Sequence, residues 1–334
     1  MLESRNDLET TRMTTDLRLT DEPVGFSASE LVTCPRCGRQ NGPDRAACLY
    51  CGEILPSTER NSHEGGLELR KLDVWEPGFS LIARSRSTLD DSNLSGAAKL
   101  IGVDKTVLYS IFDSSAPLPL ARIESKEVAN EAVKRLSDLG FSAAIIDESD
   151  LKIERPPARL RNLGTEASQL RLTDFNSGKS TMIDRAVVIL IVTGRVVETR
   201  RDEVAKRKKG QTKILDETET GSDLRLIDIY TSADIIGYRI QTNGFDFSVL
   251  GEDKGILANE NIEKLADFLE LHCPNAMIAD EYDSIRSLLD VVWESETRKE
   301  TQVRGYDKRK YATTYTSSNL SQFTKYSRMR RLLI

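Results

Sequence analysis

The stretch TCPRCGRQNGPDRAACLYCG, residues Thr33 to Gly52, contains the clearest chemical pattern in this chain. It holds four of the five cysteines as two pairs, Cys34 with Cys37 and Cys48 with Cys51. Two thiolates separated by two residues can bind one metal ion from a single tight turn. A glycine follows each pair, and glycine lets the backbone turn beneath the sulfur atoms. We therefore expect two metal-binding knuckles here.

Together the two pairs supply four thiolates, which form a closed tetrahedral set for Zn²⁺ and leave no coordination position open for chemistry. The spacing between the pairs is short for a zinc finger, but it suits a compact ribbon with a turn at residues Asn41 to Asp44. Iron bound by four thiolates is the main alternative. Two further alternatives are disulfides and a redox pair. Disulfides are rare in cytosolic chains, and a thioredoxin-like redox pair would need a surrounding βαβ pattern, which is absent here.

The same stretch resembles the small zinc ribbons found at the N-termini of many bacterial proteins, through its two CxxCG knuckles. The resemblance implies a structural Zn²⁺ held by Cys34, Cys37, Cys48 and Cys51. Because so short a segment buries little core, metal binding would supply its folding free energy. We expect no zinc catalysis.

The composition indicates a soluble protein with polar linkers. Of the 334 residues, 39% are hydrophobic and 30% are charged, and the mean hydropathy is −0.40. The longest apolar run, Ala186 to Val192, suits a buried strand and is too short to span a membrane. The acidic first residues lack an apolar core, so we expect no secretion signal and a cytoplasmic location. Only His63 and His272 could serve histidine-centred catalysis.

The predicted fold class is α+β with several domains. An N-terminal zinc ribbon precedes a small β-α-α-β-α-β sandwich, and a mixed antiparallel sheet with two helices follows. The expected segments are a disordered region 1–30, the ribbon 31–55, a linker 56–77, a first α/β domain 78–150, a linker 151–180, a second α/β domain 181–295 and a basic, aromatic tail 296–334.

Residues 78–150 show alternating strand and helix patterns. One strand is expected to start at Phe79, and two more are expected to span Leu118 to Ile123 and Phe141 to Ile146. Asp104 and Ser125 stand at expected helix N-caps, and a glycine closes the second of these helices.

Within this segment, residues Ser115 to Ile146 resemble the last part of the C-terminal domain of the bacterial ribosomal stalk protein, a fold shared with the adaptor of the Clp protease. The resemblance implies a compact α/β sandwich that docks to other proteins. The factor-binding surface of the stalk protein is basic, whereas the corresponding region here keeps only Lys99 and Lys105. We therefore expect neither translation-factor binding nor a degron pocket.

Residues Asn176 to Thr181, NSGKST, partly match a phosphate-binding P-loop. Thr173 stands where that motif needs its first glycine, and an apolar strand follows where it needs a helix. We expect no nucleotide binding here.

The apolar patterns in residues 181–295 predict strands joined by a basic, flexible loop at Lys206 to Gly210. Asn243-Gly244 predicts a hairpin between YRIQ and FDFSVL. Two amphipathic helices follow, with His272 and Cys273 between them. Because neighbouring side chains on a helix point in different directions, we expect no catalytic dyad, and Cys273 should be a buried small hydrophobe. We recognise no family for this part.

Charge is distributed unevenly along the chain. Residues 214–290 carry 17 acidic and 5 basic side chains, whereas residues 301–334 carry 8 basic and 1 acidic. Basic residues interleaved with tyrosines suit RNA or single-stranded DNA. The candidate nucleic-acid-binding residues are Lys206, Arg207, Lys208, Lys209, Arg328, Arg330 and Arg331, supported by arginines of the ribbon. Alternatively, the tail folds over the acidic domain of the same chain, or its last helix docks on an anionic membrane.

No readable motif supplies a nucleophile, an acid–base pair or a cofactor loop. We therefore favour a zinc-binding adaptor or interaction protein with an unidentified protein partner. Nucleic-acid binding is the first alternative. An enzyme in residues 181–295 is the second, with a metal held by Asp228, Asp234, Asp246 and Asp280.

Overall fold

The computed structural model describes residues 31–42, 45, 47–53, 55, 69–70, 72–73, 75–86, 90–114, 116–208, 211–303 and 310–334. The chain divides into two compact units, residues 1–66 and 67–334. The fold is α+β, as predicted. The expected disordered region 1–30 and residues 56–68 of the expected linker, including His63, lie outside the described residues.

The first unit is a minimal ribbon. Strands β1 (Val32–Thr33) and β2 (Gln40–Asn41) pair antiparallel, with Val32 opposite Asn41. Its apolar cluster consists of Val32, Leu55 and three of the cysteines. So small a core cannot by itself compensate for the conformational entropy that folding removes.

The second unit begins with the expected β-α-α-β-α-β order, which the structure confirms. The elements are β3 (Phe79–Arg86), α1 (Asp91–Ile101), α2 (Lys105–Asp113), β4 (Leu118–Ile123), α3 (Lys126–Asp138) and β5 (Phe141–Asp147). The strands form an antiparallel sheet in the order β4-β3-β5. Asp104 and Ser125 accept hydrogen bonds from backbone amides at the starts of α2 and α3, as predicted.

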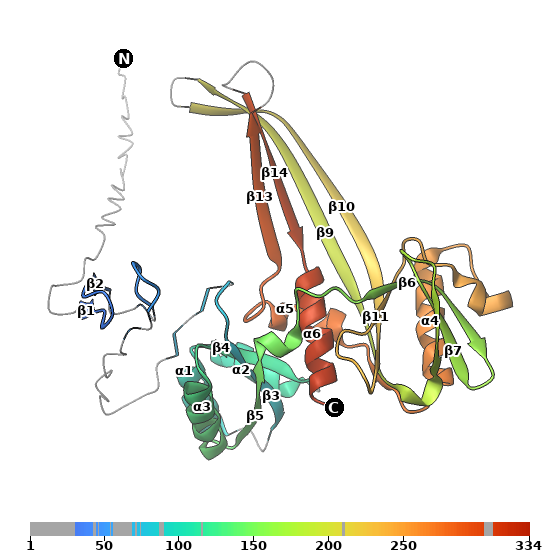
Figure 1. Ribbon diagram of the computed structural model, residues 1–334, viewed down its shortest axis with the longest axis horizontal. Coiled ribbons are helices and arrows are strands. Elements are labelled where there is room, and N and C mark those ends of the chain that lie inside the picture. The colour runs from blue at the N-terminus through green and yellow to red at the C-terminus, as the bar shows by residue number, and fades with distance from the viewer. Residues whose placement is uncertain are drawn as a thin grey trace, which may run out of the picture. The chain divides into compact units, whose positions relative to one another are not determined.

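A large mixed sheet makes up the rest of this unit (Figure 1). Its order is β13-β14-β9-β10-β11-β6-β7-β8, and β12 pairs with β9 beside this path. The strands are β6 (Ala158–Glu166), β7 (Gln169–Asp174), β8 (Ser180–Asp184), β9 (Val188–Lys208), β10 (Gln211–Thr231), β11 (Tyr238–Gln241), β12 (Met277–Ala279), β13 (Glu296–Val303) and β14 (Lys310–Ser318). The helices are α4 (Ala258–His272), α5 (Tyr282–Leu289) and α6 (Leu320–Leu332), with 3-10 turns η1 (Glu148–Leu151), η2 (Arg185–Val187) and η3 (Phe247–Asp253).

The structure corrects three expectations about loops. The predicted linker 151–180 contains strands β6 and β7 and the start of β8, because its polar residues alternate with the buried Leu160, Leu163, Leu170 and Leu172. The predicted loop at Lys206 lies in β9 up to Lys208, since β9 and β10 pair along their whole length. The predicted tail 296–334 forms β13, β14 and α6, and β14 pairs with β9.

Two turns differ from what the sequence patterns suggested. The segment FDFSVL is not a hairpin strand, because Asp246 accepts the amide of Ser248 and starts η3, while Phe245 and Phe247 are both buried. The P-loop-like segment is a turn between β7 and β8. There the Asp174 carboxylate accepts the amides of Asn176 and Ser177, so an acidic side chain occupies the donors that a phosphate would need.

One buried hydrophobic cluster connects the first α/β segment to the C-terminal elements. It includes Leu81 and Leu118 from the small sheet, Leu190 from β9, and Trp293 and Phe323 from the C-terminal part. The two α/β segments predicted as separate domains therefore share a continuous core within the second unit. A second cluster lies between α4 and strands β6, β7, β9 and β10.

Helix α6 fastens this shared core through Arg328, which is fully buried. The Arg328 guanidinium donates to the carbonyl oxygens of Leu151 and Lys152, and at 2.5 Å to that of Arg155. The carbonyls of Leu151 and Lys152 lie at the end of η1, and that of Arg155 lies in the bend just after it, so helical hydrogen bonds do not satisfy these acceptors. Burial lowers the pKa of Arg328, and an arginine still remains charged in proteins.

Replacing Arg328 should therefore destabilise the second unit. Arg328→Ala leaves the three carbonyl oxygens without their charged donor, and we expect the free energy of unfolding to fall by about 3 kcal/mol. Arg298→Ala is the matched control, because that side chain is 75% exposed. Chemical denaturation followed by tryptophan fluorescence measures both variants, and equal stability of the two would contradict the assigned role of Arg328.

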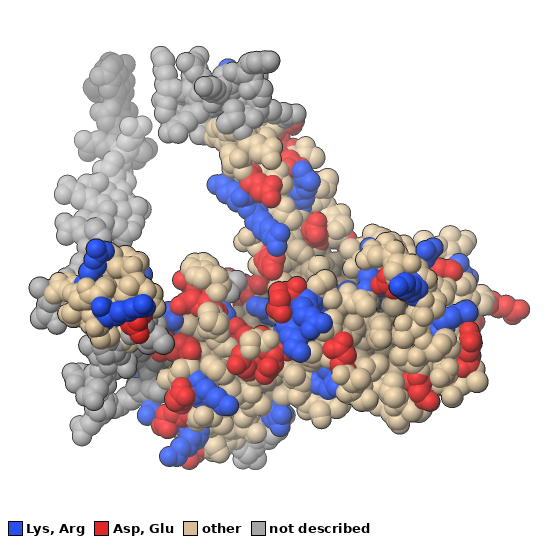
Figure 2. All heavy atoms as spheres, in the orientation of Figure 1, with Lys and Arg blue, Asp and Glu red and all other residues tan. Residues whose placement is uncertain are grey.

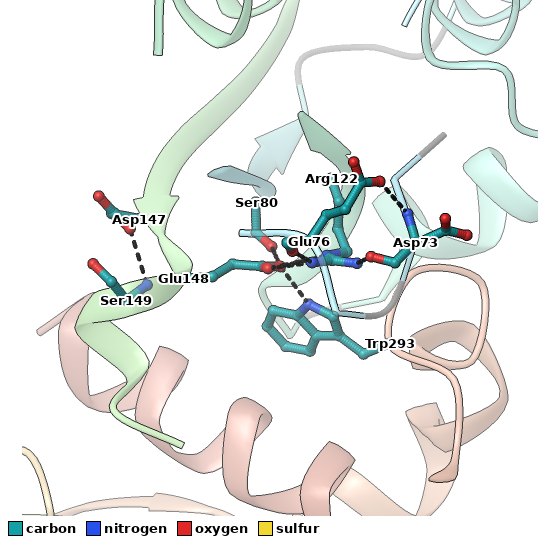
Figure 3. A network of polar contacts seen from close by, with 8 residues as sticks. All are labelled: Asp73, Glu76, Ser80, Arg122, Asp147, Glu148, Ser149 and Trp293. Atoms are coloured by element: carbon teal, nitrogen blue, oxygen red, sulfur yellow. Dashed lines mark hydrogen bonds and ion pairs between the residues drawn. The ribbon is translucent and has the colours of Figure 1, made fainter. Parts of the chain in front are cut away.

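A second polar connection centres on Glu148 (Figure 3). Its carboxylate accepts Arg122 Nε at 2.8 Å, Ser80 Oγ at 2.7 Å and Trp293 Nε1 at 3.4 Å. The Arg122 guanidinium also donates to the carbonyl oxygens of Asp73 and Glu76. Burial opposes ionisation of Glu148, but the hydrogen bonds from Arg122 and Ser80 outweigh it and lower the pKa.

The lowered pKa of Glu148 predicts a specific pH dependence. A carboxyl whose folded pKa lies below its unfolded value of about 4.3 stabilises the fold above that pH, and loses this contribution as the pH falls through the folded value. Glu148→Gln should therefore destabilise the protein by about 1–3 kcal/mol at pH 7, with a smaller difference below pH 4. Glu131→Gln, at an exposed helical ion pair, is the control. A difference that stays constant from pH 7 to pH 3 would exclude the ionised network.

Candidate metal centre

The two cysteine pairs lie on equivalent backbone turns. In the first, the Cys34 amide donates to Arg39 O and the Gly38 amide donates to Cys34 O, both at 2.9 Å. In the second, Cys48 donates to Glu53 O at 2.8 Å and Gly52 donates to Cys48 O at 2.9 Å. Gly38 and Gly52 have φ of 69° and 73°, the left-handed region that glycine enters without strain. The expected knuckles are therefore present.

These turns bring the four sulfur atoms together. The Sγ atoms of Cys34, Cys37, Cys48 and Cys51 all lie within 4.8 Å of one another. The Sγ–Sγ distances are 3.6 Å for Cys34–Cys51 and 3.5 Å for Cys37–Cys48. Disulfide sulfurs lie about 2 Å apart, whereas a tetrahedron with metal–sulfur bonds of about 2.3 Å has edges of about 3.8 Å. The cluster can thus hold one metal ion.

Asn41 joins the two knuckles and was expected only as a turn residue. It is buried, and its Oδ1 accepts the Leu49 amide at 2.9 Å. Its Nδ2 donates to Arg39 O at 2.9 Å and approaches Cys48 Sγ at 3.5 Å. One amide side chain therefore fixes the second knuckle against the first. Pro43 and Asp44 of the expected turn lie outside the described residues.

The thiols affect one another's ionisation. Burial opposes ionisation of Cys48, but hydrogen bonds from the Tyr50 and Cys51 amides lower its pKa to about 6. For Cys51, the hydrogen bond from the Glu53 amide lowers the pKa, but burial and the three neighbouring sulfurs raise it to about 12. The first thiolate therefore forms readily, and further thiolates accumulate only when a cation compensates their charge. Metal binding should release protons and weaken as the pH falls.

The surface near the cluster is partly apolar. Leu49 and Tyr50 are 63% and 54% exposed at the second knuckle. The Arg39 guanidinium lies 4.5 Å from the centroid of the Tyr50 ring, and Arg36 pairs with Glu53 at 3.3 Å. Arg36 and Arg39, two of the ribbon arginines expected to support nucleic-acid binding, thus have partners within the ribbon.

The three tail arginines proposed for nucleic-acid binding are engaged within the second unit. Arg328 is buried, as described above. Arg330 forms an ion pair with Glu281, and Arg331 donates to the carbonyl oxygens of Thr231 and Ser232. This arrangement fits the alternative in which the tail folds onto its own chain. Lys206 and the backbone of Arg207 and Lys208 lie at the end of β9, and Lys209 lies outside the described residues.

The acidic residues considered for an enzymatic metal site have separate roles. Asp228 is buried and forms a bidentate pair with Arg239 at 2.6 and 2.7 Å. Asp234 and Asp246 accept nearby backbone amides, and Asp280 is exposed. Within the described part of the chain, the cysteine quartet is the group of potential metal ligands that comes together.

Cys273 is buried as expected, which raises its pKa to about 11, and His272 Nδ1 lies 2.7 Å from Phe268 O.

Comparison with protein-family models, with curated proteins and with solved structures finds no match to this chain. The resemblance of residues Ser115 to Ile146 to the ribosomal stalk protein therefore gains no support. Among the described residues, the helices are too short or too polar to cross a bilayer.

Asn41→Ala should weaken metal binding without removing a ligand. Because residues that orient metal ligands typically contribute 10–100-fold in affinity, we expect a loss of about that size. Competition of the full chain with a chromophoric chelator measures the affinity. Arg36→Ala, which removes an exposed ion pair in the same ribbon, is the control and should keep the original affinity. Unchanged affinity in Asn41→Ala would show that the ligands need no such support.

Proposed function

We propose that this protein is a zinc-binding, multidomain interaction protein in which the metal has a structural role. The observation that carries the proposal is the cluster of four cysteine Sγ atoms within 4.8 Å of one another. A set of four thiolates is typical of structural zinc sites, since it fills the tetrahedron and leaves no position for substrate or water.

The softness and geometry of the donors restrict the ion to zinc or iron. Tetrahedral thiolate sets select zinc or iron, and the paired knuckles with an amide–sulfur contact from Tyr50 suit both. Zinc needs no redox partner, so it is the ion we assign. The thiols are free and must stay reduced to bind metal, which favours the reducing cytoplasm as the location.

The second knuckle offers a surface for a protein partner. Leu49 and Tyr50 are exposed side by side, and Arg39 packs on the tyrosine ring. Tyrosine and arginine are enriched among residues that dominate binding energy at protein interfaces. The metal would hold these residues in place, because Leu49 and Tyr50 lie between the ligands Cys48 and Cys51. The ribbon thus serves as a rigid platform for recognition.

Affinity capture with the tagged full chain tests this role. Proteins that co-purify after nuclease treatment should be lost from the double variant Leu49→Ser, Tyr50→Ser. The matched control is Ile256→Ser, Leu257→Ser, which alters two aliphatic residues that are 101% and 59% exposed near the start of α4. We expect the control to retain the partners, because it leaves the ribbon unchanged.

Metal content distinguishes loss of the surface from loss of the ribbon. Both double variants should retain the same amount of zinc, because neither changes a ligand. Partners that remain bound to the Leu49→Ser, Tyr50→Ser variant, or capture that disappears completely after nuclease treatment, would contradict a protein-docking role for this knuckle.

A further inference from the structure

Helix α4 carries more apolar side chains than its contact with the second hydrophobic cluster uses. Ile262, Leu265 and Leu269 are buried in that cluster. Successive residues of an α-helix are turned by about 100°, so Leu271, nine residues after Ile262, stands on the opposite side of the helix. Leu271 is accordingly 80% exposed, and Phe268 lies partly buried between the two sides. The C-terminal half of α4 thus presents an apolar flank beyond the core.

A groove lies between this flank and η3. Its volume is about 470 Å³, within the range of about 300–1,000 Å³ that is typical of ligand pockets. The apolar part of its lining consists of Val249, Leu250, Phe268 and Leu271. The ring of His272 stacks on that of Phe268 with 4.0 Å between the centroids, which extends this wall. The groove can therefore accept more than one apolar side chain.

Two polar contacts fix the segment that joins η3 to α4. The buried Asn261 accepts the Gly255 amide at 2.7 Å through Oδ1 and donates from Nδ2 to the Gly255 carbonyl oxygen at 3.0 Å. Lys264 Nζ donates to the carbonyl oxygen of Asp253 at 2.8 Å. The two walls of the groove are thus held in place before any partner binds, which lowers the cost of ordering on binding.

The rim of the groove is acidic. Residues 247–272, which span η3 and α4, carry six acidic and two basic side chains. Glu263 pairs with Arg225, whereas the other five form no ion pair within the described part of the chain. These five are Glu252, Asp253, Glu260, Asp267 and Glu270, of which Asp253 and Asp267 line the groove itself. Figure 2 shows acidic side chains at the end of the second unit where Figure 1 places α4. A positively charged partner would complement this rim.

We propose that the groove between η3 and the C-terminal half of α4 binds a basic amphipathic helix of a partner protein. The apolar face of that helix enters the groove, and its lysines or arginines meet the carboxylates of Asp253 and Asp267. This site lies in the second unit, goes beyond the ribbon-based interaction proposed above and does not depend on it.

The lining and the charge of the groove favour such a helix over other partners. The described lining residues all belong to η3 or α4. An extended segment would find no strand there to pair with its backbone N–H and C=O groups, whereas a helix satisfies its own. The acidic rim repels nucleic acid and anionic membranes, and it disfavours a second copy that docks groove to groove.

Fluorescence anisotropy of the zinc-loaded full chain with a labelled synthetic peptide tests the proposal. The peptide consists of leucine and lysine, is about 15 residues long and has its leucines at i, i+3, i+4 and i+7, so that they line one face of a helix. We expect a dissociation constant in the micromolar range. A second peptide of the same composition, with its leucines spread around the helix, should bind at least about tenfold more weakly, because it has no apolar face for the groove.

Two double variants locate the site. Val249→Ser, Leu271→Ser removes apolar surface from both walls and should weaken binding of the first peptide at least about tenfold. The matched control, Val291→Ser, Leu320→Ser, alters two aliphatic residues that are each 39% exposed elsewhere in the second unit. It should bind the peptide as the unmodified protein does.

The acidic rim is tested by Asp253→Asn, Asp267→Asn. This variant should bind the first peptide several-fold more weakly at low salt, and the difference should shrink at high salt because salt screens the charges. Thermal unfolding should show that all three double variants are folded. Absence of peptide binding, equal binding of the two peptides, or an equal loss in the control variant would each overturn the proposal.

The groove and the ribbon can be tested separately. The variant Leu49→Ser, Tyr50→Ser should bind the first peptide normally, because it leaves η3 and α4 unchanged. A complex of micromolar affinity that forms at about 10⁶ M⁻¹ s⁻¹ lasts on the order of a second, so it dissociates during the washing steps of affinity capture. Capture through the ribbon therefore reports on the ribbon alone.

Discussion

The crowding of four sulfur atoms is the constraint on which the N-terminal unit depends. Four thiolates within 4.8 Å would repel one another strongly without a cation. Although the hydrogen bond from the Glu53 amide lowers the pKa of Cys51, burial and the three neighbouring sulfurs already raise it to about 12. Among the described residues of this unit, the apolar cluster adds only Val32 and Leu55 to the cysteines. Structural zinc can supply on the order of 10 kcal/mol to such a module. One ion would therefore define the shape of both knuckles and of the surface that they present.

The second unit depends on a different feature. Its C-terminal helix packs between elements that are distant in sequence. Helix α6 contacts the end of η1 through Arg328, the end of β10 through Arg331 and the loop before α5 through Arg330. Gln322 adds hydrogen bonds to Asp290 and to the carbonyl oxygen of Trp293. Helix α6 thus connects η1, which follows the small sheet, to β10 and α5 in the rest of the second unit. Strands β9, β10, β13 and β14 extend away from these elements (Figure 1).

The sequence predicts local features well and long-range features poorly in this protein. The knuckles, the caps at Asp104 and Ser125 and the burial of Cys273 depend on short spacings, and the structure contains all of them. The role of Asn41 is absent from any pattern, since it depends on the approach of two turns. The arginines of α6 looked like a basic tail because their partners are mostly backbone carbonyls, which no sequence motif identifies. The joining of Lys206 with Lys310 likewise depends on strand register across more than a hundred residues.

The metal centre is the claim most directly open to measurement. X-ray absorption at the zinc edge of the purified full chain, combined with elemental analysis, reports the number, type and distance of the ligands. The account predicts about one zinc per chain with four sulfur ligands at about 2.3 Å and no oxygen or nitrogen neighbour. A folded ribbon without metal, or a bound ion with lighter ligands in place of any of the four cysteines, would contradict it.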